Sequence, residues 1–85
     1  MADYKIEIKK SAVKELKVLP NSTLKRTIDK INSLAINPRP LGCKKLSSDE
    51  QYRIGTGDYR ILYTIHDEVL VICVVKVAHR REVYK

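Results

Sequence analysis

The stretch "YRIGTGDYRILYTI", residues 52–65, decides the fold, because two runs of alternating apolar and polar side chains flank a turn signal. Gly57-Asp58 lies between the runs, and glycine at the first central position suits the type II′ turn that joins antiparallel strands. We therefore expect strands over Gln51–Thr56 and Tyr59–His66, paired as a hairpin. One side of this hairpin is apolar and is the natural side for helices to cover. That side holds Tyr52, Ile54, Ile61 and Tyr63.

The other side of the hairpin is cationic. In the expected register Gly55 faces Arg60, and Arg53 lies two positions before Gly55 and so on the same side of the sheet. Moving the turn to Thr56-Gly57 leaves both arginines on a common side. Each guanidinium is a planar fork of donors that matches two phosphate oxygens, and Gly55 leaves open backbone between the forks. The pattern indicates a phosphate site on the uncovered face. The alternative is a pair of solvated arginines that bind nearby carboxylates, Asp58 or Glu82.

A third strand follows the hairpin. "VLVICVVKV", residues 69–77, is apolar on both alternating faces, which predicts a strand in the interior of the sheet. A two-residue turn at Asp67-Glu68 would pair it with the preceding strand and set Val75 opposite Arg60. The basic tail "HRREVYK", residues 79–85, would then return to the arginine face. Its side chains of chemical interest are His79, Arg80, Arg81 and Tyr84.

The N-terminal half supplies one strand and two helices. "YKIEIK", residues 4–9, alternates as a strand does. From Lys10 the apolar residues recur every three positions until Pro20 ends the pattern, which predicts an amphipathic helix. A second helix is expected from Asn21 or Ser22 as cap to a point before Asn37-Pro38. The order predicts a single α+β domain over residues 1–85, a strand, a helical hairpin and a three-strand antiparallel meander, with the helices on one face.

The charge balance favours a polyanionic partner. The 85 residues carry a net charge of +7 and have a sequence pI near 9.6, which is typical of proteins that bind nucleic acid, although a surplus of lysine also keeps small proteins in solution. Residues 1–48 hold 11 basic and 4 acidic residues, a net +7, and residues 49–85 hold 6 of each. Lys44 and Lys45, in the loop "RPLGCKKLSSDEQ", are candidate nucleic-acid contacts. The alternative is that these two lysines only keep the protein in solution.

Several protein classes are disfavoured by what the sequence lacks. Cys43 and Cys73 show no metal-ligand spacing, so neither a metal nor a cofactor is expected. The start, "MADYKIEIKK", does not read as a signal peptide, and no apolar run approaches the roughly 20 residues that cross a membrane. We expect a cytoplasmic protein with reduced thiols and no membrane partner.

Three segments together resemble the RelE/ParE superfamily of type II toxin–antitoxin toxins: "PRPLGCKKL", "YRIGTGDYRILYTI" and "VAHRREVYK", in that order along the chain. The resemblance implies the RelE-like βααβββ fold. In the RelE branch it implies a metal-independent, ribosome-dependent endoribonuclease that cuts mRNA in the decoding site. The implied partners are a cognate antitoxin and the ribosome with its mRNA.

The resemblance also implies roles for individual residues. Arg60 and Arg80 correspond to the arginines that stabilise the scissile phosphate and the leaving group, and Arg53 to the one that holds the neighbouring backbone. Arg81 is the alternative to Arg80. Tyr84 is the implied general base, and His79 is the alternative acid or base because imidazole titrates near neutral pH.

At Gly55 the chain departs from the pattern of many RelE-type sequences, which carry a second basic residue there. The departure keeps open the ParE branch, in which a similar fold inhibits DNA gyrase without nuclease chemistry. A third interpretation is an RNA-binding module without catalysis, whose affinity would fall steeply with salt.

Overall fold

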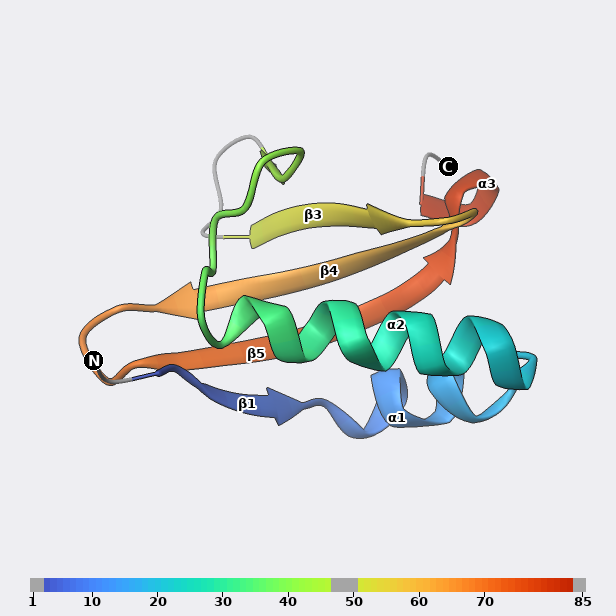
Figure 1. The fold of residues 1–85 in the computed structure, drawn as a ribbon, viewed down its shortest axis with the longest axis horizontal. Coiled ribbons are helices and arrows are strands. Elements are labelled where there is room, and N and C mark those ends of the chain that lie inside the picture. Colours follow the sequence, from blue (N-terminus) through green and yellow to red (C-terminus); the bar gives the residue numbers. More distant parts are fainter. Residues whose placement is uncertain (1–2, 47–50, 84–85) are drawn as a thin grey trace.

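The computed structural model describes residues 3–46 and 51–83, and it confirms the predicted α+β class. Five strands form one sheet in the order β1-β5-β4-β3-β2, in which β1 runs parallel to β5 and all other neighbours are antiparallel (Figure 1). The elements in chain order are β1 (Lys5–Ile8), α1 (Lys10–Lys17), α2 (Asn21–Leu34), β2 (Lys44–Lys45), β3 (Gln51–Thr56), β4 (Tyr59–His66), β5 (Val71–His79) and α3 (Arg80–Val83).

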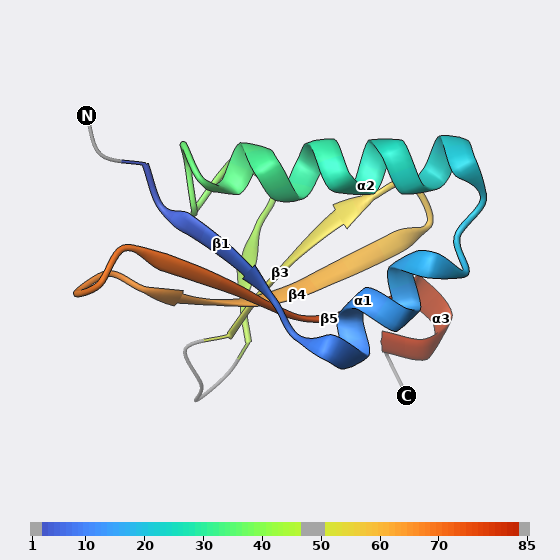
Figure 2. The same cartoon turned by 90° about the horizontal axis from the view of Figure 1, so that it is seen from below.

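The core lies between one face of the sheet and the helices. The apolar side of the β3–β4 hairpin is buried against α1 and α2, as predicted, and α2 runs along this face in both views (Figures 1 and 2). Tyr52 and Tyr63 stack across the hairpin with their ring centroids 5.8 Å apart. The largest fully buried side chains are Tyr63, Ile31, Leu34, Ile61, Ile72, Val74 and Thr27. The opposite face of the hairpin is left for the cationic residues.

The strand β5 changes its neighbour halfway along its length. Its first part pairs with β1, as far as Ile8 opposite Val74. Beyond that point the chain turns into α1, where Glu15 accepts a hydrogen bond at Oε1 from the backbone N–H of Val77, at 2.9 Å. Glu15 Oε2 also meets Lys76 Nζ at 3.3 Å. The helix α1 therefore covers the part of the β5 edge that β1 leaves, and β5 is an interior strand as predicted.

The expected turn between the last two strands is wrong. The connection from β4 to β5 spans four residues, 67–70, and Leu70 takes a positive φ of 55°. An irregularity between Leu62 and Tyr63 shifts the register once more, so Arg60 lies opposite Ala78 and not opposite Val75. The strand consequently begins and ends two residues later than predicted.

Other differences from the sequence predictions are local. The helix α2 follows Pro20, whose carbonyl oxygen accepts from Leu24 N–H at 2.8 Å, and neither Asn21 nor Ser22 caps it from outside. The short strand β2 and the helical turn α3 were not predicted. No helix in the ranges 3–46 and 51–83 is long and apolar enough to cross a membrane.

Candidate phosphate-binding groove

The β3–β4 hairpin brings Arg53 and Arg60 to the uncovered face of the sheet. The register confirms the sequence prediction, with Gly55 opposite Arg60 and Arg53 opposite Leu62. Gly57 has a positive φ of 62°, which is what a type II′ turn requires at its first central position. The period-two alternation that buries Ile54 and Ile61 on one side therefore places both arginines, each partly buried, on the other.

Around these arginines the surface is hollowed into a groove, which we call the cationic groove. It is lined by Gly42, Lys44, Arg53, Gly55 and Arg60. Three of these residues are cations and none is an acid, so the groove suits an anion such as phosphate.

Arg60 is held in place by the hairpin that carries it. Its Nη1 donates to the carbonyl oxygens of Tyr59 at 2.9 Å and of Gly57 at 3.2 Å. The guanidinium lies over Gly55 on the neighbouring strand. The hairpin thus fixes both the position and the plane of the charge.

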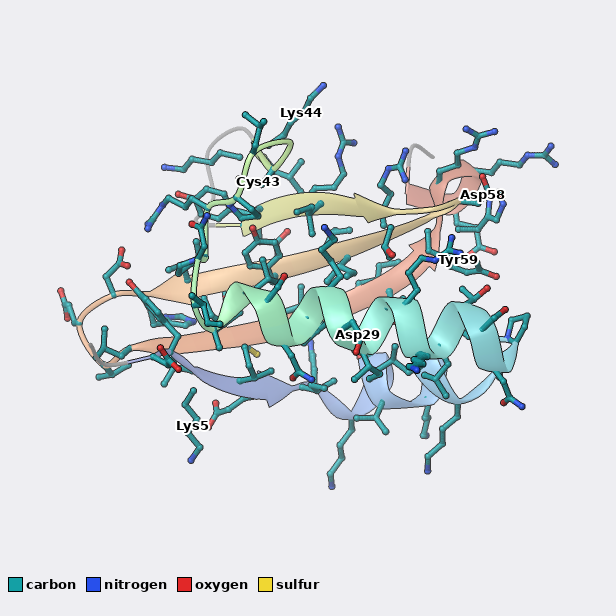
Figure 3. All side chains as sticks on the ribbon, in the orientation of Figure 1. Lys5, Asp29, Cys43, Lys44, Asp58 and Tyr59 are labelled. Carbon is teal, nitrogen blue, oxygen red and sulfur yellow. The ribbon has the colours of Figure 1, made fainter. Side chains whose placement is uncertain are left out.

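The strand β2 adds Lys44 to the groove. Lys44 pairs with Arg53 and so lies on the same face, whereas Lys45 pairs with Tyr52 and lies toward the other face. Figure 3 shows Lys44 extending outward from the edge of the sheet. Of the two lysines predicted as nucleic-acid contacts, the structure brings only Lys44 to the arginines.

Gly42 is a groove residue that the sequence analysis missed. Cys43 N–H donates to Pro40 O at 3.1 Å, and Gly42 has φ of 96°. This is the arrangement of a type II turn, whose third residue must take a positive φ. The glycine two positions after Pro40 was the available signal. The turn directs Lys44 back along β3.

The loop before β2 is anchored by a set of side chains that we call the Asp67 clasp: Tyr4, Arg39 and Asp67. Arg39 Nη2 meets Asp67 Oδ2 at 2.9 Å, and Tyr4 OH donates to Asp67 Oδ1 at 2.6 Å. Hydrogen bonds from Arg39 and then Tyr4 hold the pKa of Asp67 below its ordinary value. The clasp ties residues 37–43 to the β4–β5 turn and so positions the loop that leads into the groove.

The turn α3 brings Arg80 and Arg81 to the tip of the same hairpin. Arg80 N–H donates to Asp58 O at 2.8 Å. Figure 2 shows α3 at the end of the sheet on the side away from α2, and Figure 3 labels Asp58 beside it. Neither arginine is among the residues that line the groove. Tyr84, the predicted base, lies outside the described residues.

His79 does not join the arginines, and the expectation that it would is wrong. It pairs with Tyr59, which lies on the helix-covered side of β4, and the two rings meet edge to face with centroids 5.5 Å apart. His79 Nδ1 accepts a hydrogen bond from Arg81 N–H at 3.2 Å. The irregularity between Leu62 and Tyr63 is the cause. The longer turn shifts the register by two residues, which keeps each side chain on its face, and the irregularity shifts it by one more, which moves His79 to the other face.

Both the sequence and the fold are similar to those of known toxins. The model of the family described as "ParE toxin of type II toxin-antitoxin system, parDE" matches residues 6–84. A curated protein from Methanocaldococcus jannaschii, named "Putative toxin RelE1", is 36% identical over 86 residues, which cover 96% of each chain.

Solved structures agree with this family match. A chain of the archaeal RelE–RelB complex from Pyrococcus horikoshii OT3 superposes with a TM-score of 0.83 at 30% identity, over 92% of this chain and 96% of that chain. The isolated E. coli RelE toxin gives a TM-score of 0.80 at 27% identity, over 95% of this chain and 90% of that chain. The fold is thus that of a small type II toxin with RelE architecture. The chain belongs to the ParE toxin family of type II toxin–antitoxin systems, within the RelE/ParE superfamily.

Proposed function

We propose that this toxin is a ribosome-dependent mRNA endoribonuclease that acts in the cytoplasm and needs no metal ion. The observation that carries the proposal is the cationic groove, which Lys44, Arg53 and Arg60 line together with Gly42 and Gly55. Fixed cations on an uncovered sheet face are what a transferring phosphate requires, because the transition state gains negative charge on its oxygens.

The proposed reaction is attack by the ribose 2′-oxygen on the adjacent phosphorus. The 2′-hydroxyl loses its proton to a base, a new P–O2′ bond forms, and the P–O5′ bond breaks. The products are a 2′,3′-cyclic phosphate and a 5′-hydroxyl, whose oxygen takes a proton from water. Arginine cannot act as the base, because its pKa lies above about 12. The arginines therefore stabilise charge.

Each residue of the proposed set has its own role. Arg60 contacts the scissile phosphate, and Arg53 and Lys44 hold the neighbouring backbone phosphates. Arg80, or Arg81 in its place, neutralises the leaving 5′-oxygen from α3, which is attached to the hairpin tip through Asp58. Tyr84 is the proposed base. A phenol ordinarily has a pKa of about 10, so this role requires that positive charge of the active site lower the pKa of Tyr84.

We also propose a cognate antitoxin as partner. Similar toxins from Pyrococcus horikoshii and Methanococcus jannaschii were solved as complexes of RelE with RelB. An antitoxin for this chain would combine an apolar segment that packs on exposed apolar residues with acidic groups that meet the basic surface.

The test is cleavage of a defined mRNA on purified ribosomes, with the new RNA ends mapped. We expect cuts in the decoding site only when ribosomes are present, and a loss of about 10²–10³-fold in rate for Arg60→Ala, the usual effect of removing one preorganised donor. Lys25→Ala, which removes an exposed cation from α2, serves as control and should cleave as the wild type does. Absence of cleavage at every protein concentration, or equal rates for wild type and Arg60→Ala, would contradict the proposal.

Gyrase inhibition is the second candidate, because the family model that matches the chain is that of ParE toxins. Inducing the protein in cells and examining both their DNA and their mRNA distinguishes the two functions. Trapped gyrase–DNA breaks with intact mRNA would support the ParE activity, and cut mRNA with intact DNA would support the nuclease.

A further inference from the structure

The contact between Arg60 and Gly55 leaves no room for a side chain at position 55. A methyl group built on Gly55 would lie 2.8 Å from Arg60 Nη1, closer than real Cβ atoms come to other atoms, and 3.1 Å from Cζ, which is tighter than most real contacts. The atoms in the way belong to the end of a flexible side chain. An alanine at this position would therefore move Arg60 and leave the backbone of β3 where it is.

The same contact decides which donors of Arg60 remain for a ligand. A guanidinium has five N–H groups. The two on Nη1 have acceptors within the hairpin, the carbonyl oxygens of Gly57 and Tyr59. Within residues 3–46 and 51–83 the structure gives Nε and Nη2 no partner. These two nitrogens form the side edge of the guanidinium, whose parallel N–H groups match two oxygens of one phosphate.

Lys44 and Arg53 line the groove into which this guanidinium is fixed. If Arg60 were displaced from Gly55, its Nη1 would lose the two carbonyl acceptors and its fork would lose its fixed direction. Its long side chain would then have to be ordered when the ligand binds, which costs free energy.

We propose that Gly55 is a positioning residue for phosphate binding. By having no side chain it lets Arg60 lie across β3 with Nη1 fixed on its own turn and the Nε and Nη2 edge directed to a phosphate of single-stranded RNA. The inference deepens the proposed function and rests on it, in that the ligand is the backbone of the RNA substrate.

The test is a double-mutant cycle of Gly55→Ala and Arg60→Ala, measured as affinity for a short single-stranded RNA with 2′-O-methyl groups, which cannot be cleaved. Ribosomes are absent, so the assay does not depend on turnover. We expect each single variant to lose about tenfold in affinity, the range for one charge-assisted contact, and the double variant to lose no more than either. Gly55→Ala in the Arg60→Ala background is the matched control, because the methyl group added at position 55 then has no guanidinium to displace.

A second readout is the NMR signal of the Arg60 Nε–H group, assigned with Arg60→Lys. It should shift when RNA is added to the wild type and shift much less in Gly55→Ala, while the thermal midpoints of the two proteins agree within the error of the measurement. Wild-type affinity in Gly55→Ala, or additive losses in the double variant, would overturn the inference. So would a wild-type protein that binds the RNA no better than Arg60→Ala. Failure of the wild type to cut mRNA on ribosomes, with the cycle as expected, would count against the nuclease alone.

Discussion

Tyr63 and Thr27 are fully buried residues with hydroxyl groups, and they differ in hydrogen bonding. Tyr63 OH donates to Pro38 O at 2.7 Å, which attaches the loop before β2 to the middle of the sheet. Burial raises the pKa of Tyr63, so the hydroxyl stays protonated and keeps donating. Thr27 Oγ1, on α2, has no partner among the residues that the structure describes. A buried hydroxyl without a partner costs free energy, whereas a methyl group of the same shape does not.

Replacing Thr27 by valine should therefore stabilise the protein. Valine has nearly the same shape and the same branched Cβ, so helix packing is preserved while the unpaired hydroxyl is removed. We expect the free energy of unfolding to rise by about 1 kcal/mol, measured as a higher urea midpoint at unchanged slope.

Thr23→Val is the control for this change. Thr23 lies one helical turn earlier on α2 and is only partly buried, so its hydroxyl can bind water and its removal should give no gain. A Thr27→Val protein that is no more stable than the wild type would mean that its hydroxyl is satisfied in solution.

At the scale of elements, one turn and one strand irregularity decide how much could be predicted. The β3–β4 hairpin carries a glycine at the one position that needs it, and its register and its arginine face followed from the sequence. In the β4–β5 connection Val69 and Leu70 are apolar and read as strand, yet they belong to the turn, with Leu70 at φ 55°. The backbone conformation there overrides the local preference for strand. The irregularity between Leu62 and Tyr63 then leaves one extra residue in β5, which moves His79 to the helix-covered face.

Only part of the cationic groove could be predicted from the sequence. Arg53, Gly55 and Arg60 follow from alternation within one hairpin, which is a local property of the sequence. Gly42 and Lys44 enter the groove because Tyr63 and the Asp67 clasp hold the preceding loop against distant strands. Contacts of that kind, between residues far apart in the chain, leave no periodic signal.

The Asp67 clasp makes the stability of the β4–β5 turn depend on pH. Hydrogen bonds from Arg39 and Tyr4 lower the pKa of Asp67 in the folded protein, so the clasp stabilises the fold when Asp67 is ionised. This contribution is present above the unfolded pKa, near about 3.9, and is lost as the pH falls through the lower folded value. We expect Asp67→Asn to be less stable than the wild type at neutral pH, and the difference in free energy of unfolding to shrink steadily below about pH 4.

Glu68→Gln is the control, because it removes the neighbouring carboxylate of the same turn. Within residues 3–46 and 51–83, Glu68 forms no ion pair. Denaturant unfolding of the three proteins across the acid range measures the effect. A gap between wild type and Asp67→Asn that stays constant with pH, or an equal gap for Glu68→Gln, would show that the charge of Asp67 does not stabilise the turn.

At the scale of the molecule, the positive charge has two locations. The net +7 comes from residues 1–48, and the exposed lysines of α1 lie outside the cationic groove. Charges outside the groove attract a polyanion over a distance and speed encounter, and this effect is screened by salt. Fixed cations inside the groove act on the bound phosphate, where solvent and salt screen them less. The two sets should therefore affect different kinetic constants.

Changing Lys10, Lys14 and Lys17 of α1 together to glutamine tests this division on the ribosome. We expect kcat/KM to fall at low salt and its dependence on salt to become shallower, with kcat unchanged, because fewer cations take part in the encounter. The same three positions changed to arginine keep the charge and should retain the wild-type salt dependence. Arg60→Ala should do the reverse of the glutamine variant, lowering kcat while leaving the slope against salt nearly intact. A glutamine variant whose kcat falls as far as that of Arg60→Ala would mean that the lysines of α1 act on the bound RNA and not on its approach.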